Sequence, residues 1–194
     1  MVFVGGGVST AAVTVTWAPI NAKKCPPIPR SIVLLINDMK TILHIIASPG
    51  GTESHSFLLG DTLINQLPPA AVRTKLLYED APPPVSRAYI RAVYTHPSDR
   101  TAEQQDLVQY SDTIIRDVRE ADIVVIATPV HNFGIPALLK AWIDMLVRPG
   151  VTSGRGSCPF TGKKVYVAVV SGRQRNPDFI APYLKAILAE VGLT

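Results

Sequence analysis

From residue 41 onward, short apolar runs alternate with segments of helical periodicity, and no other feature of the chain constrains its fold as strongly. The expected strands cover residues 41–47, 72–80, 122–127 and 163–170. The expected helices cover residues 56–67, 101–121, 136–147 and 177–192. Strands that alternate with helices form a parallel sheet covered by helices, so the sequence predicts an α/β fold built on an open sheet.

The apolar pattern within these segments predicts how each one packs. Residues 41–47 are mostly apolar, which is typical of a strand buried on both faces, whereas residues 72–80 alternate and are expected nearer an edge. The segment 81–99 is expected to be a loop. In the first helix, leucines at every fourth position are expected to form the apolar face: Leu59, Leu63 and Leu67. In the second helix, one face is expected to hold Leu107, Ser111, Ile114, Ile115 and Val118.

The first 38 residues differ from the rest of the chain. Residues 1–22 carry no charged side chain, but they lack the basic start of a secretory signal and are interrupted by three glycines. Residues 23–30 are rich in proline, as linkers are. We therefore expect residues 1–38 to be an irregular extension without a fold of its own and the natural chain to begin at Met39. Residues 39–194 are expected to form one domain, and no membrane span is expected.

Composition excludes several classes of function. A chain of 194 residues with 47% hydrophobic side chains can bury one sizeable core. The net charge of +4 is spread along the chain without a block of Lys and Arg, so no nucleic-acid partner is expected. Cys25 and Cys158 lack C-x-x-C spacing, and the four histidines lack ligand spacing. We therefore expect no disulfide framework, no metal site and a cytoplasmic location.

Ligands of open α/β sheets bind at the carboxyl ends of the strands. Three loops of this chain are expected to meet there: residues 48–56, 128–135 and 171–176. The first loop supplies hydroxyl groups from Ser48, Ser54 and Ser56 at the start of a helix, where a phosphate is favoured. Plain capping by Ser54 or Ser56 is the alternative. No lysine follows the glycines, which disfavours a nucleoside triphosphate and favours a monophosphate cofactor.

The second loop, Thr-Pro-Val-His-Asn-Phe-Gly-Ile-Pro, is stiff for a strand-to-helix connection. Pro129 fixes its own φ, Gly134 has access to conformations closed to other residues, and Pro136 suits a helix start. This loop is either a rigid turn whose Phe133 covers a core or a rim that presents N–H groups and an aromatic edge to a planar ligand. In the third loop, Gly172 permits close backbone approach. Together, the three loops predict a pocket for flavin mononucleotide (FMN).

The region from about Met39 to the end resembles the FMN-dependent NADH-azoreductase and quinone-reductase family. That family has a flavodoxin-like fold, a doubly wound parallel sheet in three α/β/α layers. The segment 127–144 is the most specific match, because family members show Pro-Met-Tyr-Asn-Phe, a small residue, a helix and a Leu-Lys pair. The other segments that carry the resemblance are 48–56, 148–152 and 161–173.

The resemblance assigns site residues. Those expected to hold the FMN phosphate are Ser48, Ser54, His55 and Ser56. Those expected to line the isoalloxazine are Pro129, Val130, His131, Asn132 and Phe133. Ser171 and Gly172 are expected on its pyrimidine side. Val130 and His131 replace the commoner Met and Tyr, which alters the surface that faces the substrate.

The resemblance also implies an activity. NADH or NADPH would give a hydride to FMN, and a quinone or azo compound would then take two electrons. His131 is expected either to donate a proton to the reduced acceptor or simply to narrow the pocket by packing. A homodimer is implied as well.

Two alternatives to this enzyme remain at this point. The first is a flavodoxin-type electron carrier, although such carriers tend to be acidic and to use a Thr-rich loop, whereas this chain is basic and uses Ser. The second is a truncated relative with impaired flavin binding, because the family supplies a fifth strand and a fifth helix after the residues matched here. We therefore expect the domain to be incomplete at its carboxyl end.

Overall fold

The computed structural model describes residues 39–154, 159–171 and 179–193, and Lys40–Thr194 forms a compact unit of its own. The predicted extension 1–38 and Gly172 lie outside the described residues. The strands of this unit are β1 (Lys40–Ile46), β2 (Ala70–Leu76), β3 (Ile123–Pro129) and β4 (Lys164–Val170). Its α-helices are α2 (His55–Ile64), α3 (Arg87–Tyr94), α4 (Ala102–Glu120), α5 (Ala137–Leu146) and α6 (Ile180–Glu190). Two short 3-10 helices are η1 (Gly51–Glu53) and η2 (Pro97–Asp99).

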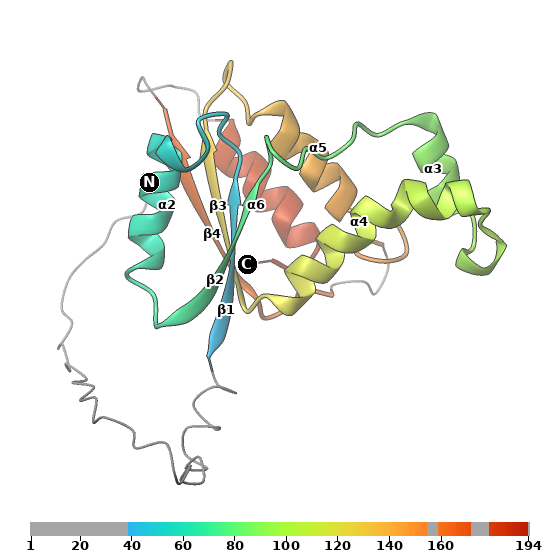
Figure 1. The fold of residues 1–194 in the computed structure, drawn as a ribbon, viewed down its shortest axis with the longest axis horizontal. Coiled ribbons are helices and arrows are strands. Elements are labelled where there is room, and N and C mark those ends of the chain that lie inside the picture. The colour runs from blue at the N-terminus through green and yellow to red at the C-terminus, as the bar shows by residue number, and fades with distance from the viewer. Residues whose placement is uncertain (1–38, 155–158, 172–178, 194) are drawn as a thin grey trace, which may run out of the picture. The chain divides into compact units, whose positions relative to one another are not determined.

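The described strands form one parallel sheet in the order β2-β1-β3-β4 (Figure 1). β1 and β3 lie in the middle because their apolar side chains alternate to both faces, and almost all of them are buried. β2 lies at an edge and is largely exposed, as its alternating sequence predicts. The predicted α/β class and open parallel sheet are confirmed.

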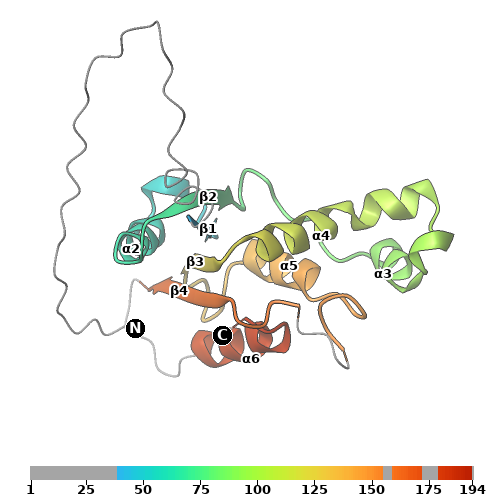
Figure 2. The same ribbon diagram turned by 90° about the horizontal axis from the view of Figure 1, so that it is seen from below.

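Helices cover the sheet on both faces (Figure 2). α2 packs alone among the described helices on one face, over two small apolar clusters that include Ile42 and Ile46. The other face carries the main core, to which α4, α5 and α6 contribute. Trp142 and Phe160 are the largest side chains buried there. The helix 101–121 is confirmed, since α4 buries Val108, Ser111, Ile114, Ile115 and Val118 while Leu107 is partly buried.

The prediction of a loop over 81–99 is wrong in part, because α3 and η2 lie inside it. Ser86 caps α3 by accepting the N–H of Tyr89 at 3.0 Å. Tyr89 and Ala92 are buried in the main core, and α3 packs against α4 rather than the sheet. A helix of 8 residues is too short to show a convincing periodicity, so it depends on this tertiary contact.

The predicted helix over 56–67 is confirmed, but its predicted apolar face is right only in part: Leu63 and Leu67 pack, partly buried, against the cluster that includes Ile42, whereas Leu59 does not. Leu59 is 45% exposed, whereas the buried residues of α2 are Ser56, Gly60 and Ile64. Small residues on this face allow the helix to approach the sheet closely. A Cβ atom added to Gly60 would lie 2.5 Å from Nε2 of His44 on β1, so only glycine fits there.

The carboxyl end of α5 is fixed by buried polar side chains. Arg148 is buried, and its guanidinium contacts Asp112 Oδ1 at 2.6 Å and Ser111 Oγ at 3.2 Å. The Ser111 hydroxyl donates to the Met145 carbonyl at 2.7 Å, and the Thr152 hydroxyl accepts the Arg148 N–H at 2.7 Å. These bonds satisfy backbone groups that a helix end leaves without partners, and they join α5 to α4.

Candidate functional site

The first two predicted loops leave the sheet at the same edge. Ala47, just after β1, donates its N–H to the Ala127 carbonyl at 2.9 Å, and Val130, just after β3, donates to the Val170 carbonyl at 2.9 Å. Figure 1 shows both loops at one end of the sheet. Ser171 follows β4 at this edge, and the rest of the third loop lies outside the described residues.

Two serine hydroxyls meet at the start of α2, and a third lies in the loop before it. The N-cap is Ser54, whose Oγ accepts the N–H of Phe57 at 3.2 Å, donates to the Gly51 carbonyl at 2.8 Å and lies 3.2 Å from Oγ of Ser56. Ser48 Oγ accepts the N–H of Gly50 at 3.3 Å. Of the two capping alternatives, the structure therefore selects Ser54, and Ser56 adds a second, buried hydroxyl beside it.

This helix start has the chemistry of an anion site. The N–H groups of His55 and Ser56 lie in the first turn, where an α-helix offers them no internal acceptor. The first turn of α2 carries no acidic side chain, and the helix dipole favours an anion there by about 0.3–1 kcal/mol. Hydroxyls and backbone amides are the donors that a phosphomonoester requires, so the residues present fit an FMN phosphate.

The second loop is a tight hairpin turn. His131 and Gly134 exchange backbone hydrogen bonds of 2.9 and 2.8 Å. The two residues between them, Asn132 and Phe133, have φ of 49° and 67°. Type I′ turns require positive φ at both central positions. A phenylalanine in this conformation is strained, and strain of this kind is concentrated at functional sites.

The side chains of this turn differ in their exposure to solvent. Phe133 is 50% exposed and so does not serve as a core residue. His131 and Asn132 are exposed as well. Val130 packs against the main core, which leaves its backbone, not its side chain, to line the rim. The turn therefore presents a rigid polar and aromatic edge at the carboxyl end of β3, as the second interpretation of the sequence requires.

Sequence reasoning missed a histidine directly behind the first loop. His44 on β1 is buried, and its ring stacks on Phe57 with centroids 5.4 Å apart. Burial lowers the pKa of His44, and the nearby Asp61 carboxylate offsets part of this effect. The signal available in the sequence was a histidine inside an otherwise apolar central strand.

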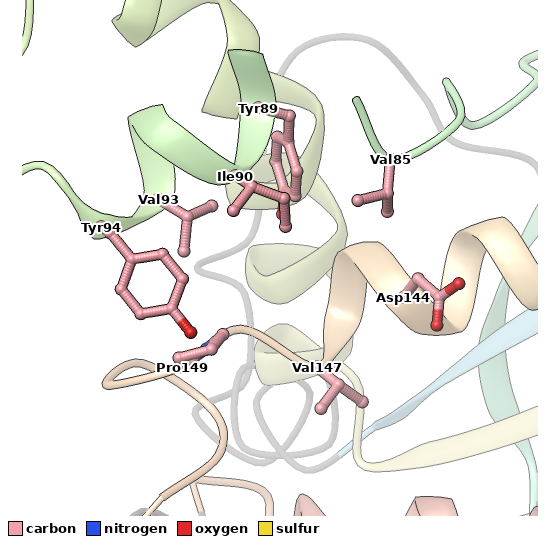
Figure 3. Close-up of a pocket in the computed structure, with 8 residues that line it drawn as sticks. All are labelled: Val85, Tyr89, Ile90, Val93, Tyr94, Asp144, Val147 and Pro149. Carbon is pink, nitrogen blue, oxygen red and sulfur yellow. The ribbon is translucent and has the colours of Figure 1, made fainter. Parts of the chain in front are cut away.

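An apolar groove lies elsewhere, between α3 and the end of α5 (Figure 3). It encloses about 270 Å³, and its lining residues include Tyr89, Ile90, Tyr94, Val147 and Pro149. None of the predicted site residues lines it. Within the described ranges, no helix is long and apolar enough to cross a membrane. The same residues hold no cluster of three or more His, Cys, Asp or Glu side chains that would suit a metal ion.

Comparison with known proteins identifies the family. Residues 40–194 match a family described as having a flavodoxin-like fold. The FMN-dependent NADH:quinone oxidoreductase of Erythrobacter litoralis is 35% identical over 169 residues, which cover 80% of this chain and 84% of the relative. The protein of the same name from Bordetella petrii is 38% identical over 167 residues, which cover 80% of each chain. This chain belongs to the FMN-dependent NADH:quinone oxidoreductase family.

Solved structures agree on the fold of this family. An azoreductase from Bacillus anthracis superposes with a TM-score of 0.70 at 24% identity, covering 80% of this chain and 83% of that one. An FMN-dependent NADH-azoreductase from the same organism, solved in complex with FMN, gives a TM-score of 0.68 at 23% identity, covering 79% and 83%. The predicted family and the predicted flavodoxin-like fold are confirmed.

Proposed function

We propose that this protein is an FMN-dependent oxidoreductase that takes two electrons from NADH and passes them to a quinone or an azo compound. Its relatives in the family are named FMN-dependent NADH:quinone oxidoreductases, and they support the predicted enzyme class, the FMN cofactor and NADH as co-substrate. FMN, when bound, supplies the redox chemistry, so the protein needs no acid–base pair of its own.

The observation that carries this proposal is the strained turn of Asn132 and Phe133 beside a hydroxyl-lined helix start. One extended ligand could place its phosphate at the start of α2 and its planar ring against the turn. The phosphate would be held by Ser48, Ser54, His55 and Ser56. The ring would be lined by Pro129, Val130, His131, Asn132, Phe133, Ser171 and Gly172.

His131 is proposed as the residue that faces the acceptor. Its side chain is exposed at the turn, while its backbone is held by Gly134. An imidazole there can donate a proton or a hydrogen bond to the reduced acceptor. Replacing His131 by Phe, which keeps bulk but removes the donor, should lower kcat for a quinone by a larger factor than it changes FMN affinity. An unchanged kcat would leave His131 with the packing role only.

A visible spectrum of the purified protein tests the proposed function. Bands of bound oxidised flavin and release of FMN in a 1:1 ratio on denaturation would support the cofactor. NADH oxidation that depends on an added quinone or azo dye would separate the enzyme from an electron carrier. A protein that binds FMN but does not oxidise NADH with any such acceptor would contradict the proposed activity.

A homodimer and a cytoplasmic location belong to the same proposal. The groove between α3 and α5 favours the dimer, because Tyr94 is 73% exposed and lies beside Ile90 in a largely apolar surface. Burial of such a surface drives association. Replacing Tyr94 by Arg should convert a dimer into a monomer in light scattering. Arg91→Lys, on the same helix, keeps the charge, changes no apolar side chain and serves as the control.

A further inference from the structure

His44 occupies an unusual place for an ionisable side chain. It projects from the central strand β1 towards α2, between Ile42 and Ile46, which face the same side. Its Nε2 is buried and has no hydrogen-bonding partner among the described residues. A buried polar atom without a partner is costly, so its retention at the centre of the sheet calls for a physical reason.

The packing around Nε2 disfavours the charged ring. Because a Cβ on Gly60 would lie 2.5 Å from Nε2, the backbone of α2 approaches this atom closely at Gly60. The imidazolium form carries a proton on both nitrogens, and no described residue accepts a proton from Nε2. Protonation of His44 would therefore leave a buried N–H without an acceptor unless α2 moves away from β1.

Movement of α2 would reach the phosphate site directly. His44 stacks on Phe57 with an interplanar angle of 22°, and Phe57 is in the first turn of α2. The Phe57 N–H donates to Oγ of Ser54, which in turn contacts Oγ of Ser56. The ring of His44 thus supports the same turn whose hydroxyls and amides are proposed to hold the FMN phosphate.

We propose that His44 is a positioning residue that holds the phosphate-binding turn in place only while its ring is neutral, so that acid weakens the grip on the FMN phosphate. Neutral His44 fills the space beneath Gly60 and stacks on Phe57, which sets the helix start against the sheet. Protonated His44 releases the helix start. The inference rests on the proposed FMN function and adds a control of that site by pH.

The groups around His44 give the sign of the effect. On α2, Asp61 favours the charged ring, but burial is the larger influence and lowers the pKa of His44. β2 and β3 place the uncharged Thr74 and Val125 beside it in register, and Tyr166 on β4 shares this face. In the folded protein, the pKa of His44 lies below its ordinary value of about 6.5. The support that the neutral ring gives to the first turn of α2 is therefore complete above about pH 6.5 and is lost as the pH falls below it.

The test compares FMN with riboflavin, which has the same ring but no phosphate. Dissociation constants are measured by fluorescence quenching with apoprotein at about pH 7.5 and about pH 5.5, on either side of the ordinary histidine pKa. In the wild type, the FMN constant should rise about tenfold more over this interval than in His44→Leu, which cannot be protonated. Riboflavin should show no such difference between the two proteins. His96→Gln is the matched control, since it removes an exposed histidine that lies outside the ligand loops and should keep the wild-type difference.

A second pair of variants tests the contact itself. Gly60→Ala, which in an open helix would be stabilising, should weaken FMN binding at least tenfold at about pH 7.5 because its methyl group displaces the imidazole. Adding His44→Ala removes the clash but also the ring that supports the turn, so it should recover the melting temperature and not the FMN affinity. Apoprotein melting, followed by circular dichroism at both pH values, shows whether each variant is folded.

The results separate two failures. If the wild type binds neither flavin, the proposed function and this inference both fail. If FMN binds and His44→Leu keeps the wild-type dependence on pH, the inference alone is overturned and the titration belongs to FMN or another group. Full recovery of FMN affinity in the double variant His44→Ala and Gly60→Ala would overturn it as well, because the turn would then be held without the ring.

Discussion

The helices that follow the two strand-to-helix connections at the ligand edge are anchored differently: α2 at its amino end and α5 at its carboxyl end. α2 begins at a side-chain cap, Ser54, with relaxed backbone. α5 begins at Pro136 with no side-chain cap, and the turn before it holds Asn132 and Phe133 at positive φ. The firm attachment of α5 lies at its other end, where Arg148 is buried.

This difference corresponds to two kinds of ligand contact. A phosphate needs a cluster of donors, and an N-cap supplies them with little strain because hydroxyl and amide groups already converge there. A planar ring needs a rigid surface to stack against. A strained hairpin turn is rigid only if the neighbouring structure holds it in its strained conformation. The first connection can therefore be damaged locally, whereas the second depends on packing farther away.

The largest expected effect comes from the first connection. The double substitution Ser54→Ala and Ser56→Ala should raise the FMN dissociation constant about 100-fold, because each hydroxyl lost to a charged phosphate is worth about 1.5 kcal/mol. Titration of apoprotein with FMN measures it. Ser86→Ala is the matched control, since Ser86 caps α3 in the same way and lies in none of the ligand loops. Unchanged FMN affinity in the double variant would remove α2 from the site.

Next in size is the anchor of α5. Arg148→Met should lower the free energy of unfolding by about 2 kcal/mol, below the range for a fully buried ion pair because Asp112 is 41% exposed. Denaturant unfolding measures it. Lys140→Met breaks an exposed pair with Asp144 on the same helix and should change stability by no more than about 0.5 kcal/mol. Equal effects of the two would show that the buried network does not hold α5.

The strained turn should respond more weakly. Asn132→Ala should lower the free energy of unfolding by about 1 kcal/mol, since alanine is less tolerant of positive φ than asparagine. Asn132→Gly should stay within about 0.5 kcal/mol of the wild type. Asn65, at φ of −65°, gives the control, because alanine is comfortable in that conformation. If Asn65→Ala is as damaging as Asn132→Ala, the turn is not strained in solution.

The smallest effect is expected from deleting residues 1–38. Their sequence lacks the periodicity of a strand or helix, and they belong to neither connection. A chain that begins at Met39 should fold and bind FMN as the full chain does. Gel filtration and FMN titration of both chains provide the comparison. Loss of solubility or of flavin in the shorter chain would show that the extension belongs to the domain.

Features encoded locally were predictable from the sequence. The strands, the longer helices and a serine cap at position 54 or 56 depend on apolar period and on hydroxyl chemistry within a few residues. The stiffness of the second loop followed from Pro129 and Gly134 alone. The edge position of β2 followed from its alternation.

Features that depend on distant contacts were not predictable. The buried position at Gly60 was missed because it depends on close packing against His44 on β1 and Ala127 on β3. α3 was missed because its stability comes from packing on α4. Arg148 donates a hydrogen bond to Ser111, which lies 37 residues earlier in the chain, and no local sequence pattern predicts such a pair.

The order of the strands has a consequence for synthesis on the ribosome. β1 lies between β2 and β3, and Thr41 at its start bonds to Asp122, 81 residues further along the chain. At about 5–20 residues per second, β1 emerges about 4–16 s before its second neighbour exists. During that interval the edge of β1 that later pairs with β3 has no partner strand, so its unpaired backbone groups are open to chaperones and to neighbouring nascent chains.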